Sequence, residues 1–240
     1  MEGQVIPIES LRFEDISLWH DGGHPVLKNT TFDFPMGGVI WLKSDEGAGK
    51  STLLNALAGL HNPTSGSYVI NDIDVVPMSF EEFLPYRLSI GYSFDYGGLI
   101  NNRTLRDNLL LPLLFHHLCT PEQAYVRVDE ILQRFEITKY AGERPAHVPG
   151  RVRKLVVVLR SIVTYPSFLL LDDPSVGLSD DILSNFVSWI DEAREAGRLS
   201  TIVVSAFDDK MVRPFDHTIV ALEGHQLFVG SQVEKRVANL

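Results

Sequence analysis

The feature that most constrains this chain is a loop at residues 44–52, between an apolar run at 38–42 and a stretch of helical spacing at 51–60. The loop reads SDEGAGKST and departs from the pattern G-x-x-x-x-G-K-[ST] only at its first position, where Ser44 replaces glycine. Glycines let backbone N–H groups curl around phosphate oxygens, and the positive end of the following helix faces that anion. The sequence therefore predicts a strand, a phosphate-binding loop and a helix. The alternative is a glycine turn before an ordinary helix.

The loop also supplies most of the candidate ligand residues. Lys50 would place a point charge near the β- and γ-phosphates of a nucleotide, and Ser51 would offer its hydroxyl to Mg²⁺. The conformational strain caused by serine in place of glycine at position 44 depends on whether the backbone there has a negative φ. The candidate nucleotide-binding residues in this loop are Ser44, Gly47, Ala48, Gly49, Lys50, Ser51 and Thr52.

A second chemical feature is the acidic end of another apolar run. Residues 168–171 are Phe-Leu-Leu-Leu, and Asp172, Asp173 and Pro174 follow directly. In a hydrolytic nucleotide site, one such carboxylate holds Mg²⁺ and the next polarises the attacking water. Asp172 is therefore a candidate metal ligand and Asp173 a candidate base. A solvated Asp-Asp-Pro turn is the alternative, and the upstream phosphate loop disfavours it.

The order of sequence patterns indicates how the chain is organised. Residues 1–45 carry the alternating apolar and polar pattern of β-strands, whereas helical spacing dominates 104–138. The last third alternates strands and a helix, with strands at 167–171, 200–205 and 217–222 and a helix at 182–196. We therefore predict an α/β core that is interrupted by a helical insert at about 104–150.

Composition narrows the class of partner. The chain has 21 Lys and Arg against 31 Asp and Glu, and the net charge of −10 argues against binding nucleic acid or an anionic membrane surface. Its longest charge-free apolar stretch, 108–114, is far shorter than the roughly 18–20 residues of a bilayer span. The first ten residues lack the features of a secretory signal. Cys119 is the single cysteine, which excludes a disulfide framework and a Cys-based zinc site. We expect a cytoplasmic domain with no nucleic-acid partner and no direct membrane insertion.

With these motifs in place, the sequence resembles the ATP-binding-cassette family of transporter ATPases over nearly its whole length. Trp19 matches the position where the family stacks an aromatic ring on adenine. A partly buried Trp beside a hairpin, or a shift of the alignment to His20, are the alternatives. Asp95 falls where the family has a glutamine that follows a strand, and the helical segment at 108–124 is similar to cassettes of lipid-export and lipoprotein-release systems.

The resemblance implies a fold, cofactors and partners. The expected fold is a P-loop NTPase core with an antiparallel β subdomain and an inserted helical subdomain, forming one nucleotide-binding domain over 1–240. The expected cofactors are ATP and Mg²⁺. The expected partners are a separate transmembrane transporter subunit and a second cassette, in a homodimer or a heterodimer, with the chain peripheral on the cytoplasmic face of the membrane.

Several family motifs are altered here. The family signature falls on 148–152, where only Gly150 matches. The D-loop aspartate is Ser179, the switch histidine is Ala206 and the catalytic glutamate is Asp173. The groups that bind phosphate and Mg²⁺ thus remain, whereas the groups that drive hydrolysis are changed.

These changes bear on catalysis. Asp173 keeps a carboxylate but is one methylene shorter than glutamate, and a misplacement of about 1 Å can cost roughly 10²-fold in rate. Ala206 has no polar side-chain atom, and loss of a positioned acid, base or stabilising group typically costs roughly 10²–10⁴-fold. Asp95 can still ligate Mg²⁺ through oxygen, but it adds a negative charge beside the phosphates.

The altered signature bears on pairing. In the family, the signature of one subunit closes on the ATP held by the other, and Pro149 has neither an N–H nor a hydroxyl for that contact. Arg151 offers a charge-assisted phosphate contact. Alternatively, Arg151, Arg153 and Lys154 form a solvated basic turn.

The leading hypothesis is an ATP-binding subunit of a transporter that binds Mg-ATP, couples to a separate membrane subunit and hydrolyses ATP weakly or not at all. One alternative is an active transport ATPase with Asp173 in place of the catalytic glutamate and Asp95 on Mg²⁺. Another is a non-transport cassette that acts on nucleic acid or the ribosome, which the acidic charge disfavours.

Overall fold

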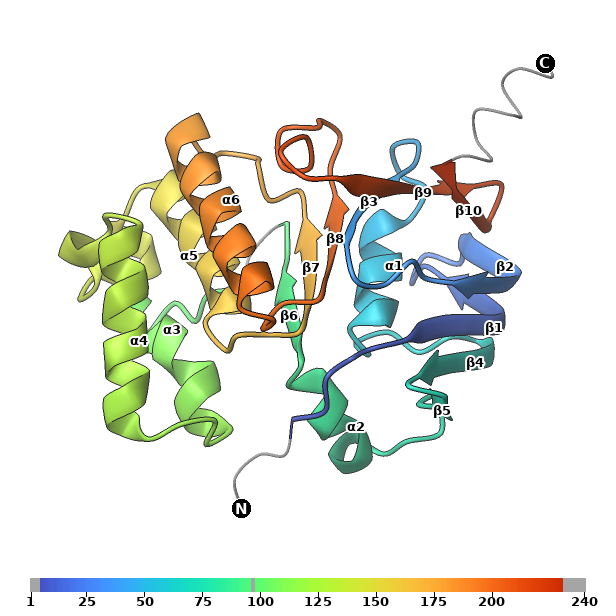
Figure 1. The fold of residues 1–240 in the computed structure, drawn as a ribbon, viewed down its shortest axis with the longest axis horizontal. Coiled ribbons are helices and arrows are strands. Elements are labelled where there is room, and N and C mark those ends of the chain that lie inside the picture. The colour runs from blue at the N-terminus through green and yellow to red at the C-terminus, as the bar shows by residue number, and fades with distance from the viewer. Residues whose placement is uncertain (1–4, 96–97, 231–240) are drawn as a thin grey trace.

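A six-stranded, mostly parallel sheet forms the centre of the molecule. The computed structural model describes residues 5–95 and 98–230. The strand order is β10-β9-β3-β8-β7-β6 (Figure 1). Its strands are β3 (Val39–Lys43), β6 (Ile90–Ser93), β7 (Phe168–Asp172), β8 (Thr201–Ser205), β9 (His217–Glu223) and β10 (Gln226–Val229). All neighbours pair in parallel except β10 with β9, so the carboxyl ends of β3, β7 and β8 share one edge.

A second, antiparallel sheet packs beside α1 and confirms the predicted β unit near the N-terminus. Its order is β2-β1-β4-β5. Its strands are β1 (Leu11–Trp19), β2 (Pro25–Asp33), β4 (Ser65–Ile70) and β5 (Ile73–Asp74). Inward-facing residues such as Phe13 and Ile16 are fully buried, as expected for a sheet with one face in the core. The predicted turn at 21–23 joins β1 to β2, with Gly23 at φ 80°.

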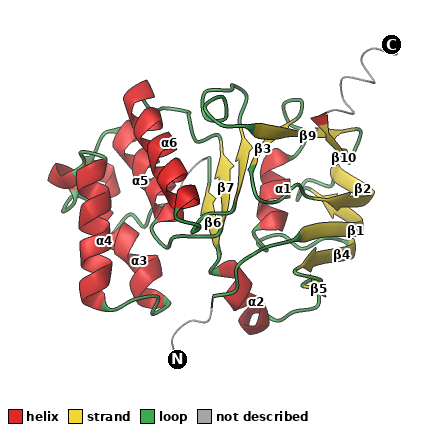
Figure 2. Cartoon of the chain, in the orientation of Figure 1, coloured by secondary structure: helices red, strands yellow, loops and turns green. Residues whose placement is uncertain are grey.

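Six α-helices cover the two sheets within the described residues (Figure 2). They are α1 (Lys50–Leu57), α2 (Phe80–Arg87), α3 (Leu105–Phe115), α4 (Pro121–Arg134), α5 (Gly150–Ile162) and α6 (Asp180–Glu195). Two short 3₁₀ turns, η1 (Thr138–Tyr140) and η2 (Pro145–His147), precede α5. Thr104 and Thr120 start α3 and α4 with capping boxes. Both helices lie inside the predicted insert at 104–150, whose standing as a separate subdomain stays a prediction.

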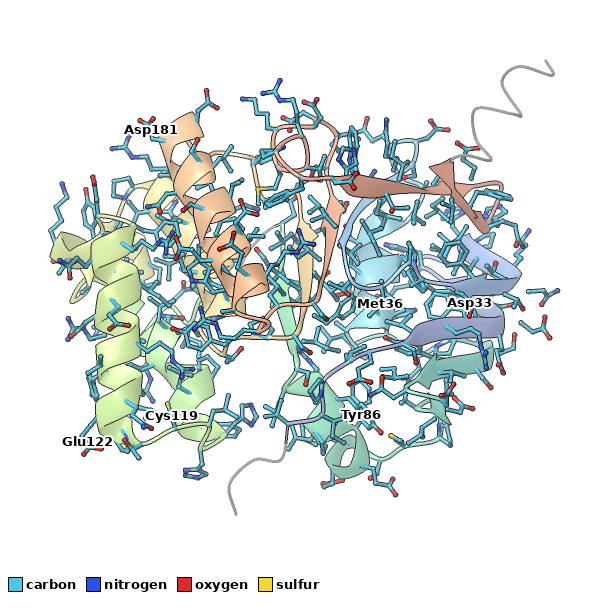
Figure 3. All side chains as sticks on the ribbon, in the orientation of Figure 1. Asp33, Met36, Tyr86, Cys119, Glu122 and Asp181 are labelled. Carbon is cyan, nitrogen blue, oxygen red and sulfur yellow. The ribbon has the colours of Figure 1, made fainter. Side chains whose placement is uncertain are left out.

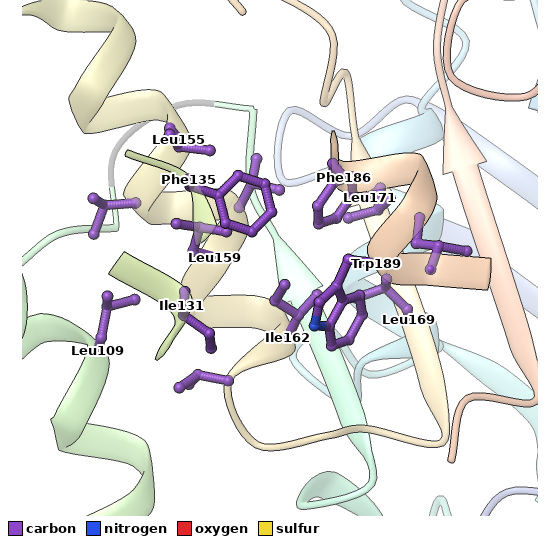
Figure 4. Packing of buried hydrophobic residues seen from close by; sticks show 14 of the residues in the cluster. Leu109, Ile131, Phe135, Leu155, Leu159, Ile162, Leu169, Leu171, Phe186 and Trp189 are labelled. Carbon is purple, nitrogen blue, oxygen red and sulfur yellow. The ribbon is translucent and has the colours of Figure 1, made fainter. Parts of the chain in front are cut away.

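The central sheet is buried on both faces. Leu169 and Leu171 of β7 pack with α3 to α6, whereas Phe168 and Leu170 face α1 and the antiparallel sheet. Figure 4 shows the first of these clusters, with Trp189 of α6 beside β7. Burial on both faces explains why β7 reads as a continuous apolar run.

Some elements differ from the sequence predictions. The first helix ends at Leu57, short of the predicted 51–60. Helix α2 was not predicted. Helix α5 contains Arg151, Arg153 and Lys154, for which a basic turn was the alternative. Cys119 lies half-buried in the link between α3 and α4 (Figure 3) and is a free cysteine. Within residues 5–95 and 98–230, no helix has both the length and the apolar character needed to cross a membrane.

Candidate functional site

The loop between β3 and α1 has the backbone that a phosphate cradle requires. Gly47 and Gly49 have φ 77° and 100°, a region that suits glycine. A Cβ atom on Gly49 would lie 2.6 Å from Val26, so two independent constraints select glycine there. Ser44 lies outside the left-handed region, so its replacement of the family glycine introduces no backbone strain. Ala48 is partly buried against the core.

Lys50 begins α1, a helix that starts with no side-chain cap and no acidic residue in its first turn. The first backbone N–H groups of α1 and the positive end of this helix are therefore available to bind an anion. The Lys50 Nζ donates to Ser44 Oγ at 3.2 Å, and the ring of Phe207 lies 4.4 Å from the same ammonium group. Ser51 is exposed and Thr52 is buried in the following turn.

Asp172 ends β7 and is only 3% exposed. Burial raises the pKa of its carboxyl, and hydrogen bonding from the Ser51 hydroxyl acts against that rise. Ser205 is its register partner on β8. The buried Ser205 Oγ makes no hydrogen bond of ordinary geometry, but it lies close enough to oppose the same rise in pKa. The contact between Ser51 and Asp172 brings the phosphate loop next to the acidic end of β7.

These residues fit a magnesium ion. Mg²⁺ takes oxygen ligands and usually binds through one or two carboxylates, water and substrate phosphates. The Asp172 carboxylate, the Ser51 hydroxyl and the unpartnered Ser205 hydroxyl provide oxygen atoms at one place. Within the described ranges, this site included, no group of three His, Cys, Asp or Glu side chains is placed to hold a metal, so phosphate and water would have to complete the ligand set.

Asp173 adopts an unusual backbone conformation directly after β7. Its φ of 43° lies in the left-handed region, which Asp tolerates better than most residues. Its N–H donates to Ser205 O at 2.8 Å, and its side chain accepts from the N–H of Phe207. Burial raises the pKa of this carboxyl, and the charges of Asp172 and Asp95 raise it further.

The segment directly after β8 is hydrogen-bonded to the neighbouring strand β3. Trp41 Nε1 donates to Ala206 O at 3.1 Å. Ala206 is buried, and it offers only backbone polar atoms at the position of the family's histidine. Phe207 follows with its side chain 65% exposed and its ring over Lys50. Trp41, Ser205 and Phe207 were not predicted as site residues, although Ser205 ends the predicted strand at 200–205 and Phe207 lies just after it, which was a signal for these two.

Asp95 lies beside this site, and its carboxylate is paired. Lys154 Nζ on α5 donates to Asp95 O at 2.8 Å and lies 3.4 Å from Oδ1. Asp95 is nevertheless near enough to raise the pKa of Asp172 and of Asp173. Its role as a magnesium ligand stays a prediction.

Trp19 ends β1 in the hairpin with β2, where its side chain is 38% exposed. Its carbonyl oxygen lies 2.8 Å from His61 Nε2. The alternative adenine platform, His20, uses Nδ1 to accept the N–H of Gly22 at 3.0 Å. Both residues are exposed, and adenine stacking on Trp19 stays a prediction.

The basic residues of the altered signature lie on a helix, so the interpretation as a turn is wrong. Pro149 is the N-cap of α5 and provides no side-chain cap. Arg153 donates to Val148 O at 2.8 Å and to Pro145 O at 3.3 Å, and Lys154 bonds Asp95. Arg151 and Arg153 are exposed, as expected of a solvated group, whereas Lys154 is partly buried.

A phosphate loop on a central parallel sheet, with a buried carboxylate beside its serine, defines the class of P-loop nucleotide-binding proteins. A family model described as ABC transporter matches residues 27–176, and the chain belongs to that family. This confirms the resemblance and the fold class inferred from the sequence.

Individual relatives are distant. The chain is 27% identical to the cell division ATP-binding protein FtsE of Haemophilus influenzae, covering 89% of this chain and 97% of FtsE. It is also 27% identical to the methionine import ATP-binding protein MetN of Caulobacter vibrioides, covering 94% of this chain and 68% of MetN. For the sulfate/thiosulfate import ATP-binding protein CysA of Vibrio vulnificus, the identity is 26% and the chain spans 62% of its length.

A solved structure supports the fold. The ATP-binding cassette MJ0796, in a dimeric post-hydrolysis state bound to ADP and Pi, aligns with a TM-score of 0.80 at 24% identity. The alignment covers 90% of this chain and 96% of MJ0796.

Proposed function

We propose that this chain is the ATP-binding subunit of an ABC transporter complex that binds Mg-ATP and hydrolyses it weakly or not at all. The phosphate loop at 44–52 would bind the nucleotide, Trp19 would stack on adenine, and Ser51 with Asp172 would hold Mg²⁺. Family membership and the names of FtsE, MetN and CysA, all ATP-binding proteins, support nucleotide binding.

One contrast within the site carries the proposal. Asp172 is buried beside the Ser51 hydroxyl at the loop, which supports the role of these two residues in holding Mg²⁺. At the end of β8, by contrast, Ala206 presents no polar side-chain atom and the Phe207 ring lies over Lys50. When bound, Mg²⁺ would neutralise phosphate charge. Ala206 would then provide no side chain to orient the water that attacks the γ-phosphate.

The partner arrangement follows from the same family. We propose a separate transmembrane subunit as partner, and a position at the cytoplasmic face of the membrane without direct insertion. A second cassette would pair with this chain, either another copy or a different subunit. Pairing with an intact cassette would leave one composite site with Asp173 and Ala206 and the other with the altered signature at 148–152. The helical insert at 104–150 would act as a subdomain of one cassette over 1–240.

An active ATPase that uses Asp173 as base is the second candidate. The raised pKa of the Asp173 carboxyl makes it a stronger base than an exposed aspartate, which favours this role. The Phe207 N–H opposes this role, because its interaction with the carboxylate lowers the same pKa and so weakens the base.

Binding and turnover separate these candidates. We expect purified protein to bind Mg-ATP and the Lys50→Ala variant to lose that binding by on the order of 10²-fold, since Lys50 supplies the charge facing the phosphates. Titration with a fluorescent ATP analogue measures binding, and Lys139→Ala, which removes a lysine at η1, is the control. Phosphate release at rates of about 1 s⁻¹ or more, lost on Lys50→Ala, would favour the active ATPase.

A further inference from the structure

Three carboxylates gather at the phosphate end of the central sheet. Asp172 ends β7, Asp173 follows it directly, and Asp95 lies just after β6. Asp95 is close enough to both to raise their pKa values. A triphosphate placed on the loop at 44–52 would add several negative charges to this neighbourhood, and Mg²⁺ and Lys50 would offset only part of them.

Lys154 is a cation held against this group from outside the phosphate loop. Its Nζ donates to Asp95 O at 2.8 Å and lies 3.4 Å from Oδ1. Its charge also lowers the pKa of Asp172, so it acts on the metal-binding carboxylate as well. The side chain is 13% exposed, whereas Lys210, which pairs with Asp180 at the same 3.4 Å, is 52% exposed. Solvent therefore screens the Lys154 pair less.

The position of Lys154 is unfavourable for its own helix. It lies near the N-terminus of α5, where Arg151 and Arg153 already stand and no acidic residue occupies the first turn. The positive end of a helix opposes cations there, and burial of a lysine side chain adds a desolvation cost. The interaction that offsets these costs within the described residues is the contact with Asp95.

We infer that Lys154 is a positioning residue of the nucleotide site, which neutralises Asp95 and holds its carboxylate away from the bound phosphates. The inference rests on the proposed Mg-ATP binding and adds a residue to that site. The opposite charges of Asp95 and Lys154 cancel, so the pair has the same net charge as an uncharged side chain at position 95. Loss of Lys154 leaves Asp95 as an unpaired negative charge beside the phosphates.

The expected signature is a dependence on ligand charge. Lys154→Met should weaken Mg-ATP binding by about tenfold, because the Asp95 carboxylate, no longer paired, repels each phosphate charge. The loss should be smaller for ADP, which carries less charge. Lys154→Arg should retain affinity, since the cation is kept. Asp95→Asn in the Lys154→Met background should restore it, because the unpaired charge is gone.

A double-mutant cycle with titration of ATP and ADP tests this inference. The variants are Lys154→Met, Asp95→Asn, their combination, Lys154→Arg, and Lys210→Met as the matched exposed-pair control, each checked for native unfolding temperature. Restoration in the double variant, with a larger ATP than ADP effect in Lys154→Met, supports the inference. Additive losses, or equal losses for both nucleotides, overturn it. Failure of the unmodified chain to bind Mg-ATP would instead refute the proposed function.

Discussion

At the scale of single residues, the site combines retained and replaced chemistry within a few positions. Lys50, Ser51 and Asp172 meet at the junction of β3, α1 and β7, and Ser44 fits its position without strain. Ala206 and Phe207 occupy the end of β8 without supplying a polar side chain. Under the proposed function, binding and turnover would depend on different residues of one site, and substitutions should separate them.

The glycines of the loop give a residue-level prediction about stability. Gly49→Ala should lower the free energy of unfolding by about 2–4 kcal/mol, because it combines a strained φ with a Cβ atom 2.6 Å from Val26. Gly47→Ala should cost only about 1–2 kcal/mol, since its φ is also positive but nothing lies within 4 Å of the added Cβ. Urea unfolding measures both. Equal losses at the two positions would contradict the packing argument.

Residue contacts across long sequence separations were the part of the site that could not be predicted. The loop and the Asp172–Asp173 pair were found because their chemistry is local in sequence. Lys154 and Asp95 are separated by 59 positions, so only the fold brings them together. The same holds for Trp41 and Ala206, which are separated by 165 positions.

At the scale of elements, apolar patterning predicted the buried strands of the central sheet, whereas the strands β4, β5 and β10 and several helices were not predicted. β7 was found because burial on both faces makes it continuously apolar. Helix α5 was missed because Pro149, Gly150 and the following cations indicate a turn, and packing of its apolar face overrides that preference. Helix α2 was missed because Pro85 interrupts it; the available signal was the capping box from Ser79 to Glu82.

The contact between α4 and α6 gives an element-level prediction about pH. Arg134 donates to both carboxylate oxygens of Glu192, at 2.6 and 2.7 Å, and lowers the pKa of that carboxyl to about 2. A lowered native pKa contributes stability above the ordinary value of 4.5, and that contribution is lost as the pH falls toward 2. Glu192→Gln should therefore destabilise the protein at pH 7 and progressively less below pH 4.5.

Unfolding by urea at pH 7 and at about pH 3 measures this difference. Glu195→Gln, which alters another exposed glutamate of α6, is the control. A destabilisation by Glu192→Gln that is the same at both pH values would show that the ion pair is not its source. The effect should be modest, because Glu192 is largely exposed and solvent screens the pair.

At the scale of the whole molecule, the class of fold could be predicted because the phosphate loop and the acidic strand end resemble motifs of the ATP-binding-cassette family. Residues 27–176 match the ABC transporter family, and the architecture aligns with the cassette MJ0796. Partners could not be predicted in detail, since they depend on surfaces rather than on buried patterns. The net charge of −10 favours recognition through specific protein contacts.

The most direct test of the central claim compares Mg-ATP binding with phosphate release in one preparation, for the unmodified chain and for the variant Asp173→Glu/Ala206→His. We predict that both bind Mg-ATP with similar affinity, and that turnover is near background in the first and at least about tenfold higher in the second. The account is contradicted if the unmodified chain turns over at about 1–10 s⁻¹, or if it fails to bind Mg-ATP.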